Sequence, residues 1–357
     1  MTTTERITKY DRDEPLVSIL VLNYNGKKFL KECFDSLNKT SYANFEILFI
    51  DNNSDDDSIN YVQQNYRDVK ILRLDRNLGY SGAYNHAFDQ AGGKYFVLLN
   101  FDVRVETNWL APLVAAAERD DTIAALQPKL LSMIDEGYFE YTGASGGFLD
   151  KYGYPFLRGR IFYTIEKDER QYEDEKAIFW ASGAALFLRS AVLKESGTLD
   201  QDFFLHMEEI DLCWRLHLCG YKLMVIPSAV VYHHVGASLP QGSFMKLYLN
   251  HRNNIMMMVK NLEGKNLLRI LSRRYILDLI NIFYAGLIKF DFQHAYSIIK
   301  AHTWLIFHLG MMMTKRKGVQ KRRKVRDKDY QHLVYQKSLV IDYFVKRKKT
   351  YSSLNFG

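Results

Sequence analysis

Polar side chains that follow apolar runs are the residues of this sequence best suited to chemistry. Asp51 follows one such run, and its carboxylate can accept hydrogen bonds from the imide N–H of a pyrimidine base or from ribose hydroxyls. Asn100-Phe101-Asp102 follows another, and a carboxylate beside a nucleotide pocket suits Mg²⁺ or Mn²⁺, because these ions prefer oxygen ligands. Together these residues indicate a nucleotide diphosphate bound with a divalent metal, whose charge would neutralise a leaving diphosphate.

Each of these carboxylates also has a purely structural interpretation. Asp51 can form an Asx turn that caps the following helix. Asn53 and Ser54 suit that cap better, however, and would leave Asp51 free. Asp102, considered with its two neighbours alone, is more often an ordinary turn residue.

A glycine-containing segment, residues 76–85, is expected to enter a helix. Gly79 and Gly82 allow a ligand to approach the backbone, and a helix N-terminus attracts phosphate. The segment lacks the full Gly-x-Gly-x-x-Gly pattern of dinucleotide-binding enzymes. A glycine turn that permits tight packing is an equally good interpretation.

The densest acidic cluster beside apolar residues contains Glu208, Glu209 and Asp211. A carboxylate there can act as a general base if burial tunes its pKa, whereas acids at a helix N-terminus also simply complement the helix dipole. His233 and His234 end the next apolar run. Adjacent strand residues point to opposite faces, so at most one of these histidines should face a site.

Alternating strands and helices must position these groups. Apolar β-branched runs predict buried parallel strands at residues 17–22, 46–51, 69–74 and 95–99. Helical spacing predicts the helices between them, at residues 27–37, from Ser54 onward and at residues 80–90. This alternation is typical of a doubly wound α/β sheet, in which ligands bind at the carboxyl ends of the strands. The polar groups at three of these ends should therefore converge.

The remaining sequence predicts a second part of the same region and a C-terminal extension. Its expected elements are loops and short strands at residues 132–176, a helix within 202–220, a strand at 222–232 and apolar helices at 262–313. Residues 315–349 contain fourteen Lys or Arg and three Asp, so the net charge of +7 comes from this tail. The composition, 47% hydrophobic and 25% charged, is that of an ordinary globular protein.

The apolar clusters at residues 275–290 and 295–313 do not reach the ~20 uninterrupted apolar residues of a spanning helix. We expect an in-plane amphipathic attachment, with the basic tail on anionic lipid. A helical domain with a solvated tail and two tilted spanning helices are the alternatives. Residues 1–13 lack the apolar core of a secretory signal, and three scattered cysteines fit a reducing compartment. We therefore expect a peripheral protein at the cytoplasmic face of the plasma (inner) membrane.

Taken in order, several segments resemble family 2 glycosyltransferases with the GT-A fold, and among them the rhamnosyltransferase-like branch. The resemblance covers residues 15–255. The matching segments are residues 17–26 (VSILVLNYNG), 50–55 (IDNNSD), 76–79 (RNLG) with Asn85, 98–102 (LLNFD), 182–184 (SGA) and 203–215. Their shared order and spacing make the pattern specific. The expected parts are a polar arm at 1–14, a GT-A domain at 15–255, a helical extension at 256–313 and a basic tail at 314–357.

The resemblance implies a role for each matching residue. Glu209 takes the position of the catalytic base, with Glu208 and Asp211 as rivals. Asp102 matches the metal carboxylate of the family's Asp-x-Asp motif, and His233 lies where several relatives place a histidine on the metal or diphosphate. The residues expected at the nucleotide-sugar donor are Asn23, Asp51, Asn53, Arg76, Asn77, Gly79, Asn85 and Asn100. Those expected on the acceptor side are Trp180 and Gly183.

The implied reaction is an inverting transfer of one sugar, rhamnose in this branch, from a nucleotide diphosphate to a polyprenyl-linked or cell-surface glycan, with Mg²⁺ or Mn²⁺. This sequence departs from the family pattern at Asn100, which replaces the first aspartate of the metal motif, and at Glu209, which replaces an aspartate as base. The Gln-x-x-Arg-Trp motif of processive relatives is absent, which favours one addition per encounter.

Three other functions fit parts of the sequence. The basic tail could bind nucleic acid through phosphates, but apolar helices precede it and no nucleic-acid fold motif occurs, so we expect no nucleic-acid partner. A nucleotidyltransferase would need a Gly- and Lys-rich loop after the first strand, where residues 23–26 read NYNG. A non-catalytic scaffold that binds a nucleotide sugar or a membrane surface is supported only by the departures at Asn100 and Glu209.

Overall fold

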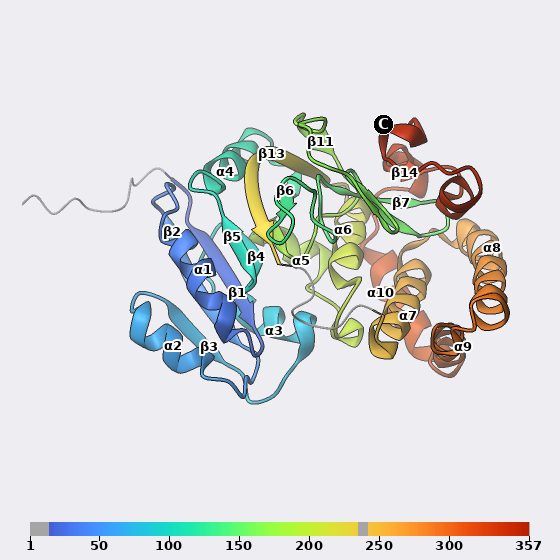
Figure 1. Ribbon diagram of the computed structural model, residues 1–357, viewed down its shortest axis with the longest axis horizontal. Helices are drawn as coiled ribbons and strands as arrows, with labels where there is room; N and C mark the ends of the chain where they lie inside the picture. Colours follow the sequence, from blue (N-terminus) through green and yellow to red (C-terminus); the bar gives the residue numbers. More distant parts are fainter. Residues whose placement is uncertain (1–13, 235–241, 357) are drawn as a thin grey trace, which may run out of the picture.

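The computed structural model describes residues 14–234 and 242–356, so residues 1–13 of the expected polar arm lie outside the described part. A central sheet of nine strands runs through the molecule, in the order β11-β13-β6-β12-β4-β1-β2-β3, with β5 paired to β13 (Figure 1). Its strands are β1 (Val17–Asn23), β2 (Phe45–Asp51), β3 (Lys70–Arg73), β4 (Tyr95–Asn100), β5 (Val103–Val105), β6 (Ile123–Ser132), β11 (Lys176–Ala177), β12 (Ala185–Arg189) and β13 (Lys222–His233).

The first half of the sheet is parallel, as the sequence predicts, and the sheet as a whole is mixed. β1 lies parallel to β2 and to β4, and β2 lies parallel to β3. β12 then runs antiparallel to both β4 and β6, while β13 lies parallel to β6. The connecting helices are α1 (Lys27–Leu37), α2 (Ser58–Asn65), α3 (Gly79–Phe88), α4 (Leu110–Arg119), α5 (Leu193–Ser196) and α6 (Glu208–Leu218).

Both faces of the sheet are buried, which explains why its strands are continuous apolar runs rather than alternating ones. Leu20 and Leu22 of β1 pack in one apolar cluster, together with side chains of α3 and α6. Ile19 and Val21 of the same strand pack in a second cluster, together with side chains of α1 and α4. The doubly wound arrangement expected from the sequence is confirmed.

Helix α2 begins later than its sequence pattern suggests. We expected a helix from Ser54, but α2 starts at Ser58. Polar side chains satisfy the intervening backbone: Asp51 Oδ2 accepts from Ser54 N at 3.1 Å, and Asp56 Oδ1 accepts from Ser58 N at 3.1 Å. Asp and Asn side chains compete with helical hydrogen bonds in this way, so the acidic run forms a turn.

A second, smaller sheet packs beside the first and includes the C-terminal segment. Its strands, in the order β10-β9-β8-β7-β14, are β7 (Gly147–Asp150), β8 (Pro155–Leu157), β9 (Arg160–Ile161), β10 (Thr164–Ile165) and β14 (Val334–Tyr335). The Phe356 ring lies 5.2 Å from the Phe148 ring, centroid to centroid. The segment expected as a basic tail, residues 314–357, is therefore folded from residue 314 to 356, with β14 and Phe356 packed against β7 and β8.

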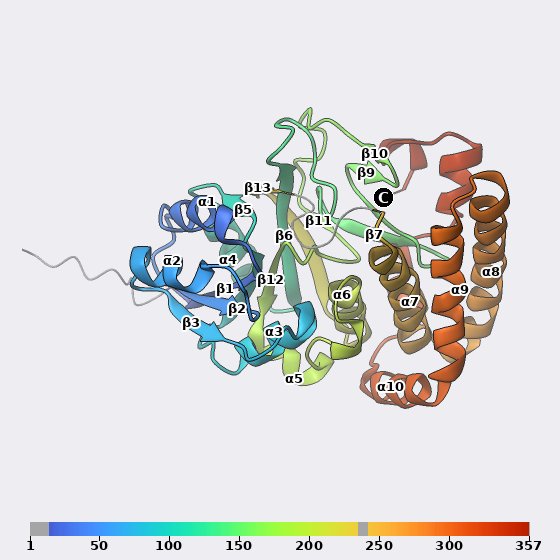
Figure 2. The ribbon, with the colours of Figure 1, turned by 60° about the horizontal axis from the view of Figure 1, so that its bottom comes forward.

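Four helices form a layer at one end of the molecule: α7 (Phe244–Asn261), α8 (Gly264–Phe283), α9 (Phe292–Phe307) and α10 (Leu309–Arg322). The boundary expected between residues 255 and 256 falls inside α7. Figure 2 shows α8 and α9 side by side at the edge farthest from α1 and α2. Within the part of the chain that the structure describes, no helix has the length and apolar character needed to cross a membrane.

Candidate active site

Asp102, Asn100 and His233 meet at the carboxyl ends of β4 and β13. Asp102, in the turn between β4 and β5, is only 3% exposed. Its Oδ1 lies 3.2 Å from His233 Nε2, and Asn100 Nδ2 lies 3.3 Å from the same nitrogen. Strand alternation turns His234 away, and its ring lies 4.8 Å from that of Phe29. One histidine of the pair therefore faces the site.

A buried glutamate, Glu140, stands behind His233. Its Oε1 lies 3.2 Å from His233 Nδ1, and Thr142 Oγ1 lies 3.0 and 2.9 Å from its two carboxylate oxygens, to which it donates. Burial lowers the pKa of His233, but the negative charges of Asp102 and Glu140 outweigh burial and raise it to about 10. The two carboxylates thus stabilise positive charge between them. Sequence reasoning missed Glu140 because the segment that contains it, residues 132–176, has little periodicity.

The donor set at this corner fits a divalent cation. Asp102 Oδ1 is buried and, apart from its ion-pair contact with His233 Nε2, has no hydrogen-bond partner among the described residues. Mn²⁺ accepts both carboxylate oxygen and imidazole nitrogen, and Mg²⁺ favours the carboxylate. Glu140 lies where a carboxylate commonly orients a metal-bound histidine through its second ring nitrogen. No group of three or more His, Cys, Asp or Glu side chains within residues 14–234 and 242–356 is placed to hold a metal, so diphosphate and water would complete the coordination.

Asn23 and Asp51 lie side by side at the ends of β1 and β2, as the parallel register requires. Asn23 Nδ2 donates to Asp51 Oδ1 at 3.2 Å and to Ser54 Oγ at 3.0 Å. Asp51 is fully buried and makes the following turn itself by accepting from Ser54 N. The expectation that Asn53 and Ser54 cap the helix and leave Asp51 free is therefore wrong. Asn23 Oδ1 is buried and has no hydrogen-bond partner among the described residues.

The loop before α3 is tied to the end of β2 by Asn52, a residue that sequence reasoning did not single out. Asn52 Oδ1 accepts from Leu78 N at 2.8 Å, and its Nδ2 donates to Asn77 Oδ1 at 3.0 Å. Asn53 has a left-handed φ of 62° in the turn between the two segments. Arg76 and Asn77 are exposed on this loop, where a ligand can reach both.

Gly79 and Asn85, both on α3, serve packing in this structure. Gly79 has φ of +67°, and a Cβ there would lie 2.3 Å from the Phe204 carbonyl oxygen. Asn85 Nδ2 donates to Leu199 O at 2.8 Å, and Asn85 Oδ1 accepts from Leu199 N at 3.1 Å. We expected Asn85 to bind the nucleotide-sugar donor. Instead, both polar groups of its side chain bond the backbone of the segment that leads to α6.

Glu208 and Glu209 begin α6 at the end of a strained loop. Positive φ angles of 63°, 72° and 72° occur at Phe204, His206 and Met207, and strain of this kind concentrates at functional sites. Burial raises the pKa of Glu209 to about 7, although backbone N–H groups at the start of α6 lower it. Burial and the charge of Glu209 raise the pKa of Glu208 well above its ordinary value. The two carboxyl groups therefore titrate as a pair that retains a proton at neutral pH.

Asp211, the third acid of the cluster, belongs to a buried ion-pair network. Its Oδ2 accepts from Arg215 Nε and from Lys260 Nζ, each at 2.9 Å, and its Oδ1 accepts from Asn261 Nδ2 at 2.9 Å. The side chain is fully buried. Both of its oxygens are already engaged, so a base at this position is better supplied by one of the two glutamates, whose Oε2 atoms are buried without a hydrogen-bond partner among the described residues.

Two tyrosines of α3 pack edge to face between neighbouring parts of the site. The rings of Tyr80 and Tyr84 lie 4.6 Å apart, and their hydroxyls donate to Gly183 O at 2.8 Å and to Leu99 O at 3.0 Å. Burial raises the pKa of both phenols; the charge of Glu209 adds to that rise at Tyr80, and the charge of Asp102 adds to it at Tyr84. Glu209 therefore lies near Tyr80, and Asp102 lies near Tyr84.

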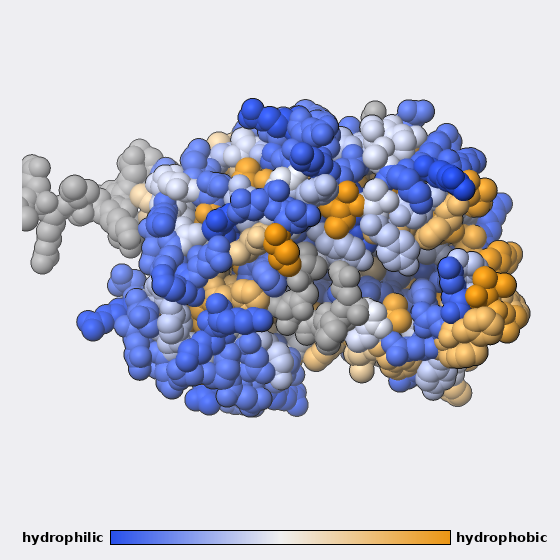
Figure 3. Space-filling model, viewed as in Figure 1, coloured by the Kyte–Doolittle hydropathy of each residue, from blue (hydrophilic) through white to orange (hydrophobic). Residues whose placement is uncertain are grey.

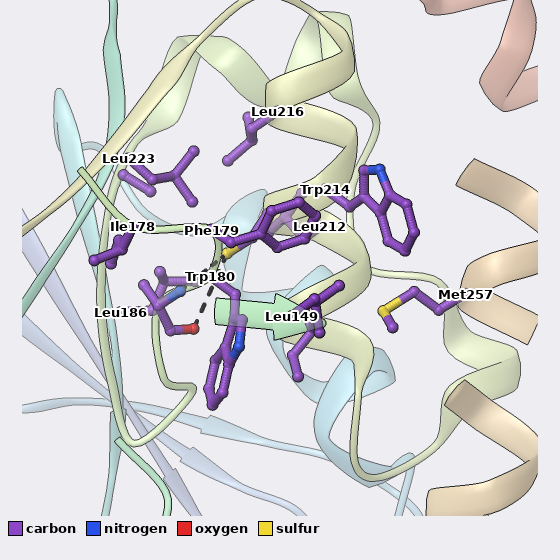
Figure 4. Packing of buried hydrophobic residues seen from close by; sticks show 14 of the residues in the cluster. Leu149, Ile178, Phe179, Trp180, Leu186, Leu212, Trp214, Leu216, Leu223 and Met257 are labelled. Atoms are coloured by element: carbon purple, nitrogen blue, oxygen red, sulfur yellow. Dashed lines mark hydrogen bonds between the residues drawn. The ribbon is translucent and has the colours of Figure 1, made fainter. Parts of the chain in front are cut away.

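Trp180 and Gly183, expected on the acceptor side, lie in the interior. Trp180 is 5% exposed, and its Nε1 donates to Phe148 O at 3.0 Å. A Cβ at Gly147 would lie 2.2 Å from the Trp180 ring, so the indole covers the start of β7. Figure 4 shows Trp180 inside the apolar cluster around α6. Trp180 is thus a core residue, and Gly183 is covered by Tyr80.

Asn253 of α7 holds the strained loop that precedes Glu209. Its Nδ2 lies 3.0, 2.9 and 2.7 Å from the carbonyl oxygens of Phe203, Leu205 and His206 and donates to them. The side chain is fully buried. One amide of the C-terminal helical layer therefore fixes the backbone on which the two glutamates depend, and no local sequence signal pairs these segments.

The Asn253→Ala variant is expected to lose activity as well as stability. The unpaired carbonyls should lower the free energy of unfolding by about 1–3 kcal/mol. A displacement of the strained loop before Glu209 by about 1 Å should lower kcat by roughly 10²-fold. Denaturant unfolding and steady-state kinetics at a temperature where the variant remains folded would measure both effects.

Asn254→Ala is the matched control for this prediction. Asn254 is the neighbouring buried amide, and it donates to Gly153 O at 2.7 Å, away from the strained loop before Glu209. We expect a similar loss of stability with kcat retained. Equal losses of kcat in the two variants would contradict the role given to Asn253.

The Glu140→Gln variant is expected to weaken the metal corner without removing a proposed ligand. Substitution of a residue that orients a metal-bound histidine lowers metal affinity or activity by about 10- to 100-fold. Titration with Mn²⁺, followed by electron paramagnetic resonance, would measure the affinity directly. Glu166→Gln is the control, because Glu166 accepts from Tyr172 Oη at 2.8 Å and from Tyr351 N at 2.9 Å in the same region, and it should leave Mn²⁺ affinity unchanged. Unchanged affinity in Glu140→Gln would show that Glu140 only supports the fold.

Comparison with known sequences places this site in context. Residues 18–194 match the family model described as "Glycosyl transferase family 2". The chain is 26% identical to N-acetylglucosaminyl-diphospho-decaprenol L-rhamnosyltransferase of Mycobacterium tuberculosis, over 70% of this chain and 86% of that protein. It is 28% identical to the O-antigen biosynthesis protein RfbC of Myxococcus xanthus, over 68% of this chain but only 19% of that much longer relative.

Solved structures share the fold at lower identity. GalNAc-T7, crystallised with UDP, GalNAc and Mn²⁺, superposes with a TM-score of 0.57 at 19% identity. The match covers 78% of this chain and about half, 51%, of that one. S. aureus TarS 1-349 in complex with UDP-GlcNAc superposes with a TM-score of 0.55 at 17% identity, over 86% of this chain and 83% of that one. These likenesses confirm the GT-A fold.

Proposed function

Since residues 18–194 form a family 2 glycosyltransferase domain on a GT-A fold, we propose that this enzyme transfers a single sugar, with inversion, from a nucleotide diphosphate to a lipid-linked or cell-surface glycan. The observation that carries the proposal is a pair of polar corners near the Tyr80–Tyr84 rings: Asp102 lies 3.2 Å from His233 at the strand ends, and Glu209 lies in the first turn of α6. One buried corner suits a diphosphate and its metal, and the other holds a carboxyl group whose pKa is raised to about 7.

Glu209 is the base in this proposal. A carboxyl group with a pKa near the working pH removes a proton efficiently and is still ionised in a large fraction of molecules. Its Oε2 makes no hydrogen bond within the described residues, so it can accept one from an acceptor hydroxyl. The hydroxyl oxygen would then attack the anomeric carbon while the bond to the diphosphate breaks, which inverts the configuration in one step. Glu208, one residue earlier, is the rival for this role.

Asp102 and His233 would hold the divalent metal, either Mg²⁺ or Mn²⁺. When bound, the metal supplies positive charge to the departing diphosphate. Asn100 stands at this corner, where its side-chain amide can donate a hydrogen bond, and Asn23 Oδ1 is left to accept one. Arg76 is exposed on the loop before α3, where its charge can meet a phosphate or a base. In this proposal the protein supplies one carboxylate and one imidazole to the metal, with neutral or cationic hydrogen-bond donors nearby.

Rhamnose is the first donor sugar to test, and a polyprenyl-diphosphate-linked N-acetylglucosamine is the first acceptor. The support is the relative from Mycobacterium tuberculosis, whose name gives both, and which this chain covers over 86% of its length. We test the proposal by incubating the purified enzyme and Mn²⁺ or Mg²⁺ with this acceptor and, in separate reactions, dTDP-rhamnose, UDP-N-acetylglucosamine and GDP-mannose.

Mass spectrometry would identify a product one sugar larger, and nuclear magnetic resonance of its anomeric proton would report retention or inversion. A single addition from one donor, with inverted configuration, is the expected result. Retention would overturn the assignment of Glu209 as a base. Binding of a nucleotide sugar without hydrolysis or transfer, with every acceptor tried, would favour a non-catalytic binding role instead.

A further inference from the structure

Three segments that are distant in sequence meet in an exposed apolar surface at one end of the molecule. They are the β9–β10 turn, the connection between α8 and α9, and the turn at Ile341–Val345. We call this surface the apolar end. Its residues are Tyr163, Phe283, Leu287, Ile288, Phe290, Phe292, Phe344 and Val345. Each is at least half exposed, from 53% for Phe344 to 77% for Tyr163.

Contacts between the segments hold this surface together. The Tyr163 and Phe344 rings lie 6.5 Å apart, and Thr164 Oγ1 lies 2.9 Å from the Tyr343 hydroxyl, with which it shares a hydrogen bond. The Tyr154 ring lies 6.4 Å from the ring of Phe162 in the β9–β10 turn, and the Tyr154 hydroxyl donates to Asp278 of α8 at 3.4 Å, so α8 packs beside the same turn. Figure 3 shows apolar surface gathered along the edge that carries α8 and the C-terminal segment.

This surface is larger than a folded monomer needs to expose. Scattered apolar side chains are ordinary on protein surfaces, but contiguous large apolar groups mark sites of interaction. The residues at its centre, Leu287, Ile288 and Phe290, are 64%, 66% and 72% exposed and lie in the short connection between the two helices. A connection of this kind is free to face a partner without disturbing the packing of α9 on α7.

Positive charge surrounds the apolar end. Lys289 lies within the α8–α9 connection, and Lys346 and Arg347 directly follow Val345; all three are exposed. Of the acids in these segments, Asp342 is 1% exposed and bound by Lys346 at 2.9 Å, and Asp291 caps α9 by accepting from His294 N. The exposed charge next to the apolar side chains is therefore mainly cationic.

We propose that the apolar end docks into the surface of an anionic lipid bilayer. Its apolar side chains would enter the boundary between head groups and acyl chains, while Lys289 and Arg347 would meet lipid phosphates. Tyr163 presents an apolar ring and a polar hydroxyl, a combination that suits the same depth. A second copy of this chain would bring like charges together around the patch, whereas anionic lipid complements them.

This arrangement alters the expectation drawn from the sequence alone. Two cations of the tail near the helical layer are paired with acids: Arg323 pairs with Asp327 at 2.9 Å in a largely buried contact, and Lys324 pairs with Glu195 at 2.5 Å at the surface. The apolar end, rather than the whole basic tail, is therefore the part we assign to the membrane. The assignment does not depend on the proposed reaction, because lipid binding is measured without donor or acceptor.

Sedimentation with vesicles tests the proposal. The full-length protein is mixed with vesicles of phosphatidylcholine alone or with phosphatidylglycerol added. We expect partition into the anionic vesicles that weakens with salt. Leu287→Ser, Ile288→Ser and Phe290→Ser combined should lower the partition coefficient at least about 30-fold. Lys289→Gln with Arg347→Gln should lower it roughly fivefold per charge, and only for the anionic vesicles.

A matched control sits at the other end of α9. Ile306, Phe307 and Leu309 are 72%, 80% and 53% exposed, and the triple serine variant at these positions removes similar apolar area. It should bind vesicles as the wild type does. Circular dichroism and slow donor hydrolysis would confirm that each variant is folded. As a second measurement, bromine-labelled lipid should quench the added fluorescence of a Leu287→Trp variant.

Several results would overturn the proposal. One is absence of vesicle binding by the wild type. Another is a loss of binding in the control triple variant that equals the loss in the variant of the apolar end. A third is a wild-type dimer, detected by light scattering, that dissociates when Leu287, Ile288 and Phe290 become serine; this result would make the surface an interface between copies of the chain.

Discussion

Glu209→Gln is expected to lower kcat by about 10²- to 10⁴-fold while leaving donor binding unchanged, because a general base contributes that much to proton transfer. Glutamine keeps the shape of the side chain but cannot take the proton of the acceptor hydroxyl. Steady-state kinetics would give kcat, and calorimetry with the nucleotide sugar would give the dissociation constant. Glu209→Asp should recover part of the activity, because a carboxylate remains within reach.

The pH profile gives this prediction a second readout. Burial raises the pKa of Glu209 to about 7, and the base acts in its ionised form. Activity should therefore be fully present above pH ~7 and should fall about tenfold per pH unit as the pH drops below that value. This acidic limb should disappear from the residual activity of Glu209→Gln.

Glu208→Gln is the control variant at the neighbouring position. Burial and the charge of Glu209 raise the pKa of Glu208 well above its ordinary value, so Glu208 should act as a base less readily than Glu209 does. We expect Glu208→Gln to retain kcat within an order of magnitude. If Glu208→Gln is inactive while Glu209→Gln works, the base is Glu208 and the helix presents its other carboxyl group to the acceptor.

Asp102→Asn is expected to lower kcat/KM by roughly 10²- to 10³-fold, because charge neutralisation by a bound metal is worth several kcal/mol in the transition state. The amide keeps the size of the side chain and removes the single carboxylate at the end of β4. Binding of Mn²⁺ in the presence of nucleoside diphosphate should weaken in parallel. Electron paramagnetic resonance would follow the metal, and the coupled release of nucleoside diphosphate would follow the reaction.

A double-mutant cycle would decide whether Asp102 and His233 act together. Their side chains lie 3.2 Å apart, so substitutions at both positions should be strongly non-additive if one metal ion needs both. Additive losses, or a Mn²⁺ affinity in Asp102→Asn equal to that of the wild type, would remove Asp102 from the metal site. The thermal stability of each variant, measured without metal, separates a binding defect from a folding defect.

The sequence was most informative where apolar runs were long and uninterrupted. β1 and α1 match their predicted ranges to within one residue, because one is buried on both faces and the other has a regular apolar stripe. β6 had no such signal. Gln127, Pro128 and Lys129 interrupt its apolar pattern, and Pro128 is accommodated beside an irregularity where the register with β13 shifts.

The site was predictable only as far as each residue followed a recognisable element. Asp102 and His233 follow or end strong strands, and the structure brings them together. Glu140 and Asn253 act across the fold, from a weakly patterned loop and from a helix more than 40 residues away from the loop it holds. Asp211 and Asn85 were predicted as site residues, but their side chains bond other parts of the fold. The sequence could not show this, because their partners, Lys260 and Leu199, come from distant segments.

The C-terminal strand β14 has a consequence for how the chain is made. It completes the second sheet by lying parallel to β7, and Tyr351 N donates to a carboxylate, that of Glu166, 185 residues earlier. Contacts of such long range form slowly and expose unpaired strand edges until they close. During translation the edge of β7 therefore stays unpaired until β14, in the last part of the described chain, has left the ribosome. A ribosome that stalls in that interval would release a polypeptide with an open sheet edge, well suited to recognition by chaperones or proteases.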